Sequence, residues 1–249
     1  MSAGTQVGPD RRGYQLLLTC EHGGNTVPDE WRTLFAGEEM RLASHRGWDP
    51  GALDAARTLA EALEAPLISA TTTRLLVDLN RSPGHRNLFS PVTRPLPAAD
   101  RARILREHYH PWRERVESTL ERMLALGPVL HVSVHSFTPV LDGRFRRVDI
   151  GLLYDPSRNA ERRFCADWHA ALRASQPALR IRRNQPYRGT ADGFTRWLRR
   201  RHPDPDYAGI ELELNQALVP TTTAATALST PIAAALGRTA IAGPTPPTS

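Results

Sequence analysis

Residues 14–25 have the sequence YQLLLTCEHGGN, an apolar run that passes directly into polar residues and glycines. Residues 14–19 have the length and the apolar character of a buried β-strand. Glu21, His22 and two glycines then stand where this strand ends. Ligand sites in α/β folds lie beyond the carboxyl ends of the strands, so the polar residues at each predicted strand end are the candidates for function.

The rest of the chain alternates short apolar runs with amphipathic helical patterns. Further strands are predicted at 67–70, 75–79, 129–134, 148–154 and 207–214. Helices are predicted at 49–64, 101–126, 160–174, 190–200 and 223–236, and Pro111 is expected to kink or divide the longest. Thr190 or Asp192 is the expected cap of the fourth helix. The alternation predicts an α/β fold of three αβα layers with a mostly parallel sheet.

The length of 249 residues fits one domain, which we expect to span 14–240. A flexible N-terminus, 1–13, is expected before it and a Pro-rich tail, 241–249, after it. No apolar run approaches the roughly 20 residues of a membrane-spanning helix. The first residues also lack the apolar centre of a secretory signal. We therefore expect a cytoplasmic protein with no membrane partner.

All 32 basic residues are arginines, and the formal net charge is +6. A basic chain can bind nucleic acid. Acidic residues are interleaved with the arginines along the predicted helices, however, as in RILREHYHPWRERVESTLER, which is typical of solvated helix faces. We therefore expect a small acidic substrate and no nucleic acid. A basic nucleic-acid-binding protein is the alternative of another class.

Two histidines and several carboxylates stand at the predicted strand ends. His22 follows the first strand, His135 follows the strand at 129–134, and Glu213 lies in the last strand. Two histidines and a carboxylate are a common ligand set of catalytic zinc. The metal activates water and polarises a carbonyl, while a separate carboxylate moves the proton. We predict His22 and His135 as metal ligands and Glu213 as the general base.

Two residues compete for the place of third metal ligand. Asp49 precedes a predicted helix, and its simpler role is to cap that helix with Pro50 at the first helical position. Glu21 is the rival, but adjacent side chains of a regular strand point to opposite faces, which counts against a site shared with His22. Asp49 is the predicted third ligand, with Glu21 as the alternative.

Asn80 and Arg81 follow the predicted strand at 75–79. An arginine guanidinium pairs with a carboxylate in a planar, bidentate geometry. We therefore predict that this pair binds a carboxylate of the substrate. The simpler alternative is a surface ion pair between Arg81 and Asp78.

Mechanisms without a metal have little support in the sequence. The two cysteines, Cys20 and Cys165, form no CxxC pair. Cys20 and His22 would share one face of an extended segment and form a nucleophile pair, but a buried strand-end cysteine is the ordinary interpretation. Ser136 follows His135 without the GxSxG motif of a serine hydrolase.

Six blocks of sequence carry a family resemblance: CEHGGNTVP, HRGWDPGA, RLLVDLNRS, VSVHSF, NQPYRG and GIELELNQ. In this order they resemble the N-formylglutamate amidohydrolase family, over residues 16–218. The resemblance implies a fold similar to that of zinc exopeptidases, a mixed sheet with helices on both faces. It also implies hydrolysis of N-formyl-L-glutamate to formate and L-glutamate in histidine degradation, with a divalent metal, zinc by preference.

The resemblance also assigns roles to residues of these blocks: metal ligands (His22, His135), the metal-site block (Asp49), the late acidic motif (Glu213) and a substrate contact (Tyr187). Asn80 and Arg81 resemble the Asn-Arg pair with which zinc carboxypeptidases hold a terminal carboxylate. The chain departs from the pattern in two places. Asn25 stands where the His-x-x-Glu of zinc exopeptidases has its glutamate, and the sequence EHGG, 21–24, stands where the deformylase branch tends to have PHSG. A deacylase or carboxypeptidase-like enzyme for a different N-acyl amino acid is therefore the alternative.

Overall fold

The computed structural model describes residues 13–241. The predicted flexible N-terminus and Pro-rich tail lie outside them, apart from Gly13 and Ile241. A six-stranded sheet of order β2-β1-β3-β8-β6-β7 forms the centre. Its strands are β1 (Gln15–Cys20), β2 (Leu67–Ser69), β3 (Val129–Phe137), β6 (Ile150–Leu153), β7 (Ile181–Arg183) and β8 (Tyr207–Asn215). Only β6 and β8 pair antiparallel within this sheet, so it is mixed and mostly parallel.

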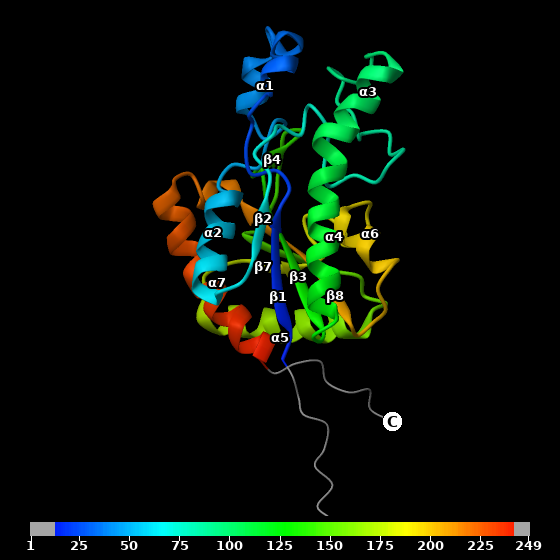
Figure 1. The fold of residues 1–249 in the computed structure, drawn as a ribbon. Helices are drawn as coiled ribbons and strands as arrows, with labels where there is room; N and C mark the ends of the chain where they lie inside the picture. Colours follow the sequence, from blue (N-terminus) through cyan, green and yellow to red (C-terminus); the bar gives the residue numbers. More distant parts are fainter. Residues whose placement is uncertain (1–12, 242–249) are drawn as a thin grey trace, which may run out of the picture.

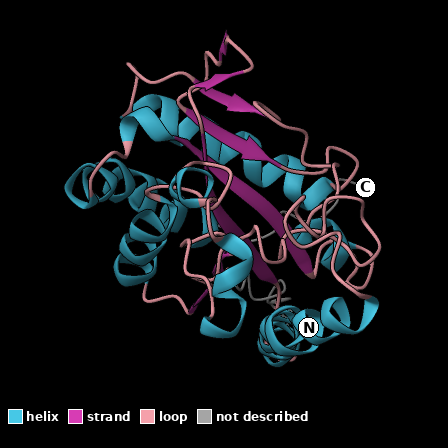
Figure 2. Ribbon diagram, turned by 90° about the horizontal axis from the view of Figure 1, so that it is seen from above, coloured by secondary structure: helices cyan, strands magenta, loops and turns pink. Residues whose placement is uncertain are grey.

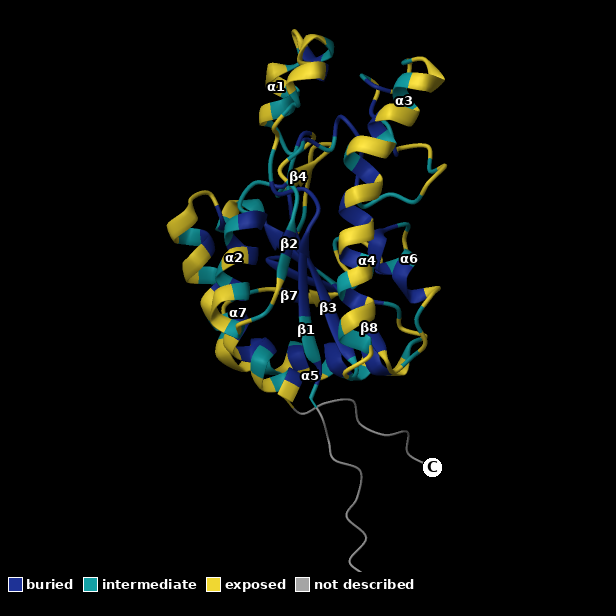
Figure 3. Ribbon diagram, viewed as in Figure 1, coloured by how far each residue is buried: buried dark blue, intermediate teal, exposed yellow. Residues whose placement is uncertain are grey.

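Helices cover both faces of the sheet (Figure 1, Figure 2). One face carries α2 (Ala52–Leu63), α5 (Asn159–Ser175) and α7 (Thr222–Ile241), which share one apolar core. The other carries α4 (His110–Leu124) and α6 (Phe194–Arg199), which share a second core. The strands between the two cores are buried, and the exposed residues gather on the outer helix surfaces (Figure 3). The predicted three-layer α/β architecture is confirmed.

Short elements stand above the carboxyl ends of the parallel strands. They are η1 (Asp29–Phe35), α1 (Glu39–Ala43), α3 (Ala98–Ile104), the hairpin of β4 (Val140–Leu141) and β5 (Arg144–Phe145), and η3 (Gln216–Leu218). In Figure 1, α1, α3 and β4 lie at the top of the molecule, beyond the upper end of β1. The sequence patterns predict neither α1, nor the hairpin, nor β7.

The predicted long helix is divided, as expected from Pro111. α3 ends at Ile104, a π-helical segment follows (η2, Leu105–Tyr109), and α4 begins at His110. Proline has no N–H for an α-helical hydrogen bond, so the widened turn lies where that bond would be lost. Within residues 13–241, no helix is long and apolar enough to cross a bilayer.

The predicted strand at 75–79 is wrong. Its apolar residues are buried, but the backbone turns instead of joining the sheet. Thr93 Oγ1 donates hydrogen bonds to the carbonyl oxygens of Leu75 and Leu76, and the amide of Asp78 donates to Leu88. Because the loop satisfies its backbone in this way, a buried apolar run here needs no strand partner.

The expected cap of the fourth predicted helix is wrong, and the alternative role of Asp49 as a helix cap is wrong as well. α2 begins at Ala52, behind Gly51 with a φ of 78°, so the cap is a residue in the left-handed region and Asp49 does not cap the helix. α6 begins at Phe194, behind Gly193 and beyond Thr190. The Asp192 carboxylate instead accepts hydrogen bonds from the amide and the hydroxyl of Ser82. The carboxylate of Asp49 is therefore available to other partners.

Candidate metal centre

The three predicted metal ligands meet above the carboxyl ends of β1 and β3. His22 follows β1, His135 lies in β3, and the amide of Asp49 donates to the His22 carbonyl, which holds the loop before α2 against the end of β1. His22 Nδ1 lies 3.4 Å from Asp49 Oδ2, and His135 Nδ1 lies 2.9 Å from the same oxygen. All three side chains are buried, and their candidate ligand atoms lie within 4.8 Å of one another. The fold thus assembles two imidazoles and one carboxylate from segments distant in the chain.

The second nitrogen of each imidazole is also held. His22 Nε2 lies 2.8 Å from Asp78 Oδ1. His135 Nε2 lies 2.8 Å from Ser133 Oγ and 3.3 Å from Glu21 Oε2. An acceptor on the far nitrogen keeps the proton there and turns the other nitrogen's lone pair towards a metal. Both Nδ1 atoms therefore face the oxygen of Asp49 in the orientation that metal-binding histidines require.

Glu21 lies on the opposite side of His135 from Asp49. Its oxygens accept hydrogen bonds from Thr19 Oγ1 at 2.8 Å and Ser133 Oγ at 2.7 Å. Burial raises the pKa of Glu21, but the hydrogen bonds from His135 and Ser133 outweigh it and bring the pKa to about 2. Glu21 is thus an ionised carboxylate that orients His135, whereas Asp49 lies beside both Nδ1 atoms, and its role as third ligand stays a prediction.

A buried hydrogen-bond chain leads from Glu21 down the sheet. The hydroxyl of Thr19 donates its only proton to Glu21. Thr19 Oγ1 must therefore accept a hydrogen bond from Nε2 of His131, 2.8 Å away. His131 Nδ1 then accepts from the hydroxyl of Tyr207, also at 2.8 Å. Burial lowers the pKa of His131 to about 4, which keeps the ring neutral as this pattern requires. Every proton in the chain therefore points towards Glu21.

Arg74 joins the two carboxylates beside His22. Its guanidinium lies 3.3 Å from Asp49 Oδ1 and 2.6 Å from Asp78 Oδ2. Burial raises the pKa of Asp49, but the two histidines, which can carry a proton on Nδ1 when no metal is bound there, and the charge of Arg74 hold it far below its ordinary value. Asp49 is thus an anion whose Oδ1 is anchored by Arg74 while its Oδ2 faces the histidines.

Glu213 lies beside His135 in the register of β3 and β8 and opposite Gly151 of β6. Its Oε2 is buried and has no hydrogen-bond partner among the described residues. Burial raises the pKa of Glu213 to about 8, with the charges of Asp49 and Glu211 adding to the effect. A Cβ on residue 151 would lie 2.2 Å from Gln185 O and 3.2 Å from Glu213 Cβ, so only glycine leaves room for both. Glu213 is therefore a confined carboxyl group with one free oxygen.

The predicted anion-binding pair lies on the β3 side of the site. Asn80 Nδ2 lies 3.4 Å from His135 Nε2, while Asn80 Oδ1 accepts from the amide of Phe194 at 2.6 Å. Arg81 donates through Nη1 to the carbonyl of Asp192, and its Nε lies 3.9 Å from Asp78 Oδ2. The ion pair with Asp78 is thus long, and the buried Nε of Arg81 has no hydrogen-bond partner among the described residues.

Tyr187 lies at the outer edge of the site, with 43% of its surface exposed. Its hydroxyl accepts a hydrogen bond from Arg146 Nη1 at 2.6 Å. Burial of the ring raises the pKa of Tyr187, and the charges of Glu213 and Asp49 add to the effect. The phenol is therefore within electrostatic reach of both carboxylates.

From the sequence, Arg74 is expected to have a supporting role, but Asp78 and Ser133 are missed as partners of the two histidines. Ser133 lies two residues before His135, a spacing that puts both on one face of β3. That spacing is visible in the sequence. The role of Ser133 beside His135 and Glu21 becomes clear only from the pairing of Ser133 with Thr19 across the sheet. Asp78 reaches His22 only because the loop at 75–79 is not a strand.

The family model described as N-formylglutamate amidohydrolase matches residues 14–219. The crystal structure of gene product Atu2144 from Agrobacterium tumefaciens shares 33% sequence identity over 92% of this chain and 91% of that chain, with a TM-score of 0.78. No curated protein sequence matches the chain.

Two further crystal structures are more distant. Murine aminoacylase 3 is 14% identical over 92% of this chain and 65% of that one, with a TM-score of 0.40. Succinylglutamate desuccinylase from Chromobacterium violaceum is 15% identical over 96% of this chain and 65% of that one, with a TM-score of 0.44. Likenesses of this size carry no inference about the chemistry of this chain.

Proposed function

The chain belongs to the N-formylglutamate amidohydrolase family, a family of amide hydrolases, and from this premise we propose that it is a metal-dependent hydrolase of N-acyl acidic amino acids. The proposed substrate is N-formyl-L-glutamate or a close relative. Water cleaves the amide, releasing formate or another acid and the free amino acid. The proposal also keeps the expected role in histidine degradation and the cytoplasmic location.

One observation carries the proposal: His22, His135 and Asp49 present ligand atoms to one another while their other polar atoms are anchored. The imidazoles are held by Asp78, Ser133 and Glu21, and Asp49 is held by Arg74. An ordinary buried ion pair needs one partner for each imidazole, whereas here both nitrogens of each ring lie beside an oxygen of another side chain. Carboxylate-anchored histidines are the common pattern of metal sites.

The donor set fits a divalent metal. Imidazole nitrogens and a carboxylate oxygen suit zinc, and manganese or cobalt as well. Four carboxylates (Glu21, Asp49, Asp78, Glu213) gather around the histidines, and the Arg74 guanidinium bridges two of them, Asp49 and Asp78. A bound cation would balance this excess of negative charge. The metal would be held by His22, His135 and Asp49, and it would supply an activated water and a polarised carbonyl.

Glu213 is the proposed general base. Its buried Oε2 has no partner among the described residues, which leaves a proton acceptor free beside His135. Glu213 would take a proton from the attacking water and deliver it to the departing amine nitrogen, so that the amide bond breaks as the new acid forms. The charge of a neighbouring cation would lower the pKa of this carboxyl and favour its ionised form at neutral pH.

Asn80, Arg81 and Tyr187 are the proposed substrate contacts. Asn80 is fixed by the amide of Phe194 beside His135, and the unpartnered Nε of Arg81 lies near it. A carboxylate held there would place the scissile amide near Glu213. Tyr187 would close the opposite edge of the site.

Elemental analysis of protein purified without a nickel column tests the metal. We expect about one divalent ion per chain in the wild type, none in His22→Ala, and the wild-type amount in His169→Ala. His169 lies on α5 and contacts the carbonyl of Ile181, so this control removes a remote imidazole. A wild type that binds no metal after reconstitution would refute the metal-dependent mechanism.

A substrate panel tests the reaction. N-formyl-, N-acetyl- and N-succinyl-L-glutamate vary the acyl group, and a dipeptide ending in glutamate tests for carboxypeptidase activity. The proposal expects release of free glutamate from at least one N-acyl member, and none after removal of the metal. Turnover of the dipeptide alone would replace the proposed reaction with peptide hydrolysis.

A further inference from the structure

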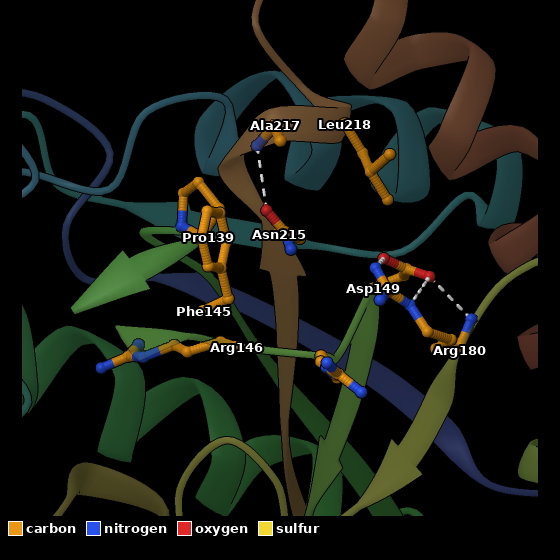
Figure 4. A pocket seen from close by; sticks show the side chains of 9 residues that line it. Pro139, Phe145, Arg146, Asp149, Arg180, Asn215, Ala217 and Leu218 are labelled. Atoms are coloured by element: carbon orange, nitrogen blue, oxygen red, sulfur yellow. Dashed lines mark hydrogen bonds and ion pairs between the residues drawn. The ribbon is translucent and has the colours of Figure 1, made fainter. Parts of the chain in front are cut away.

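A cavity of about 400 Å³ lies beyond the end of β8. Its walls come from the β4–β5 hairpin, the residues just before β6 and the η3 turn (Figure 4). Its lining includes Phe145, Arg146, Arg147, Arg180, Asn215 and Leu218. No residue to which the family resemblance assigns a role lines this cavity.

The cavity and the site share a wall. Asn215 follows Glu213 by two residues in β8, so both side chains are on one face of the strand, about 7 Å apart. Arg146 extends from the cavity wall to the Tyr187 hydroxyl, 2.6 Å away, and its guanidinium lies over the Tyr187 ring at 4.8 Å from the centroid. A small molecule with its amide at Glu213 is long enough to enter the cavity with its other end.

The charge in the cavity is positive and unbalanced. Asp149 is its one acidic lining residue, and Arg180 neutralises it through a bidentate pair of 2.9 and 2.7 Å. Arg146 bonds to the uncharged phenol of Tyr187. The Arg147 guanidinium has no hydrogen bond or ion pair within residues 13–241. Arg146 and Arg147 thus line the cavity without a carboxylate partner in the described part of the chain.

We propose that this cavity binds the side-chain carboxylate of an acidic N-acyl amino acid, with Arg147 as its main partner and Arg146 as the second. The inference rests on the proposed function, because it places the scissile amide at Glu213. Asn80 and Arg81 lie on the β3 side of the site, whereas the cavity lies at the β8–β6 side. A substrate with two carboxylates therefore has a cationic position for each.

The two positions explain how acidic and neutral amino acids would be distinguished. A glutamate side chain would form ion pairs with Arg147 and with Arg146, whose guanidinium has its only hydrogen bond within residues 13–241 with the uncharged Tyr187, whereas the amide of glutamine would form hydrogen bonds without an ion pair. Charge-assisted bidentate bonds are roughly twice as strong as neutral ones. Loss of one such pair corresponds to a roughly 10- to 100-fold loss in the specificity constant.

The test compares kcat/KM for N-formyl-L-glutamate and N-formyl-L-glutamine in the metal-loaded enzyme. We expect Arg147→Gln to lose roughly 10- to 100-fold with the glutamate substrate and to change little with the glutamine substrate. Arg146→Gln should lose less, because it leaves Arg147 in place. Arg144→Gln is the matched control: it removes a charge from the same hairpin at a residue outside the cavity lining, and both substrates should be unaffected. Equal losses with both substrates in Arg147→Gln, or none with either, would overturn the assignment.

Glutarate binding, measured by calorimetry, gives a readout that does not depend on turnover. The metal-loaded wild type and Arg144→Gln should bind glutarate alike, and Arg147→Gln should bind it roughly 10-fold more weakly or worse. If no N-formyl compound is hydrolysed but glutarate binding depends on Arg147, the proposed reaction fails and the carboxylate site stands. If both N-formyl substrates are hydrolysed at equal rates and glutarate binding is the same in Arg147→Gln, the reaction stands and this inference fails.

Discussion

The buried cluster around Glu161 and Arg199 and the buried cluster around Asp49 are both built from charged side chains, but they are completed in different ways. In the first, Arg199 donates to Glu161 at 2.8 Å and to the carbonyls of Gly189 and Gly209 at 2.6 Å each. Glu161 accepts from the amides of Gly209 and Asp155 as well. We call this the paired cluster. Each charge in it has an opposite charge beside it, and Arg158 adds a second guanidinium, with its Nε 3.3 Å from Glu161 Oε1.

The site cluster comprises His22, Asp49, Asp78, His135 and Glu213. Its three acids outnumber its two arginine partners, Arg74 and the more distant Arg81, and Oε2 of Glu213 has no hydrogen-bond partner among the described residues. A charge buried without a partner is costly, so such a cluster is retained where it serves a ligand. The comparison shows that burial of charge alone does not mark a functional site. The functional site is marked by its excess of acidic over basic side chains and by the buried Oε2 of Glu213, which has no hydrogen-bond partner among the described residues.

Glu213→Gln gives the largest expected effect on the site cluster. Catalysis should fall roughly 100- to 10,000-fold, because the amide cannot accept the proton, while metal content stays at the wild-type level. Steady-state kinetics and elemental analysis check both. The metal-free variant should also be at least as stable to urea as the wild type, since it buries no ionisable group at residue 213. Full activity would remove Glu213 from the mechanism, and loss of metal would make it a ligand.

Arg199→Met tests the paired cluster. Removing Arg199 leaves the buried Glu161 with Arg158 as its remaining cationic partner, at 3.3 Å from Nε to Oε1, which should lower the free energy of unfolding by about 3 kcal/mol, the low end for a broken buried pair. The folded fraction should keep its metal and its kcat. Urea unfolding measures the loss, with Arg200→Met as the control, because Arg200 is the exposed neighbour in the sequence. A loss of kcat in the folded Arg199→Met enzyme would contradict the division between a structural and a functional cluster.

Glu21→Gln tests the support behind His135. The amide still accepts a hydrogen bond but no longer holds a negative charge beside the imidazole. Metal affinity should fall roughly 10- to 100-fold, as for other groups that orient metal-binding histidines. Competition with a chelator of known affinity measures it, and Glu211→Gln serves as control because Glu211 accepts from Thr195 and not from a histidine. Unchanged affinity in Glu21→Gln would show that Ser133 alone orients His135.

The smallest effect is expected at the far end of the hydrogen-bond chain, at His131. Its pKa is about 4 in the folded state, and 6.5 is the ordinary value expected for the unfolded chain. Between these values the unfolded chain binds a proton that the folded protein does not, so the stabilisation is complete above pH 6.5 and is lost as the pH falls towards 4. This contributes about 2 kcal/mol between pH 7 and pH 5.

Urea unfolding of chelator-treated wild type and His131→Gln at both pH values isolates that contribution. The variant should be less stable at pH 7 and lose less stability on acidification. Equal losses in the two proteins would mean that His131 is protonated in the folded state, which would break the chain of donors that ends at Glu21.

The sequence predicts the site better than it predicts the elements that carry it. His22, Asp49 and His135 are identifiable because strand ends in an α/β sheet converge, and the structure brings the three together. Their roles as ligands stay predictions. Glu21 and Asp78 could not be assigned as orienting groups, because that assignment needs the register of β1 with β3 and the path of the loop at 75–79.

The errors have physical causes. The run at 75–79 is apolar because it is buried, and a buried loop gives the same pattern as a short buried strand. Asp49 precedes α2 at the position expected of a helix cap. The residue directly before α2 is Gly51 in the left-handed region, however, so the Asp49 carboxylate does not cap the helix. The sequence does not indicate a role for Arg146 and Arg147. The cavity that they line depends on a hairpin whose strands have only two residues each, and on the antiparallel pairing of β6 with β8, which are distant in the chain.

The two outer strands of the sheet bear on how molecules of this protein meet one another. β2 and β7 have three residues each, and two of the three in β7 are exposed arginines, Arg182 and Arg183. A sheet edge with free backbone groups is a template for a strand of another molecule, and short, charged edges are a common protection against such pairing. The long, buried β3 and β8 are enclosed between neighbours on both sides. The two longest strands of the sheet are therefore withheld from intermolecular pairing for as long as the sheet stays assembled.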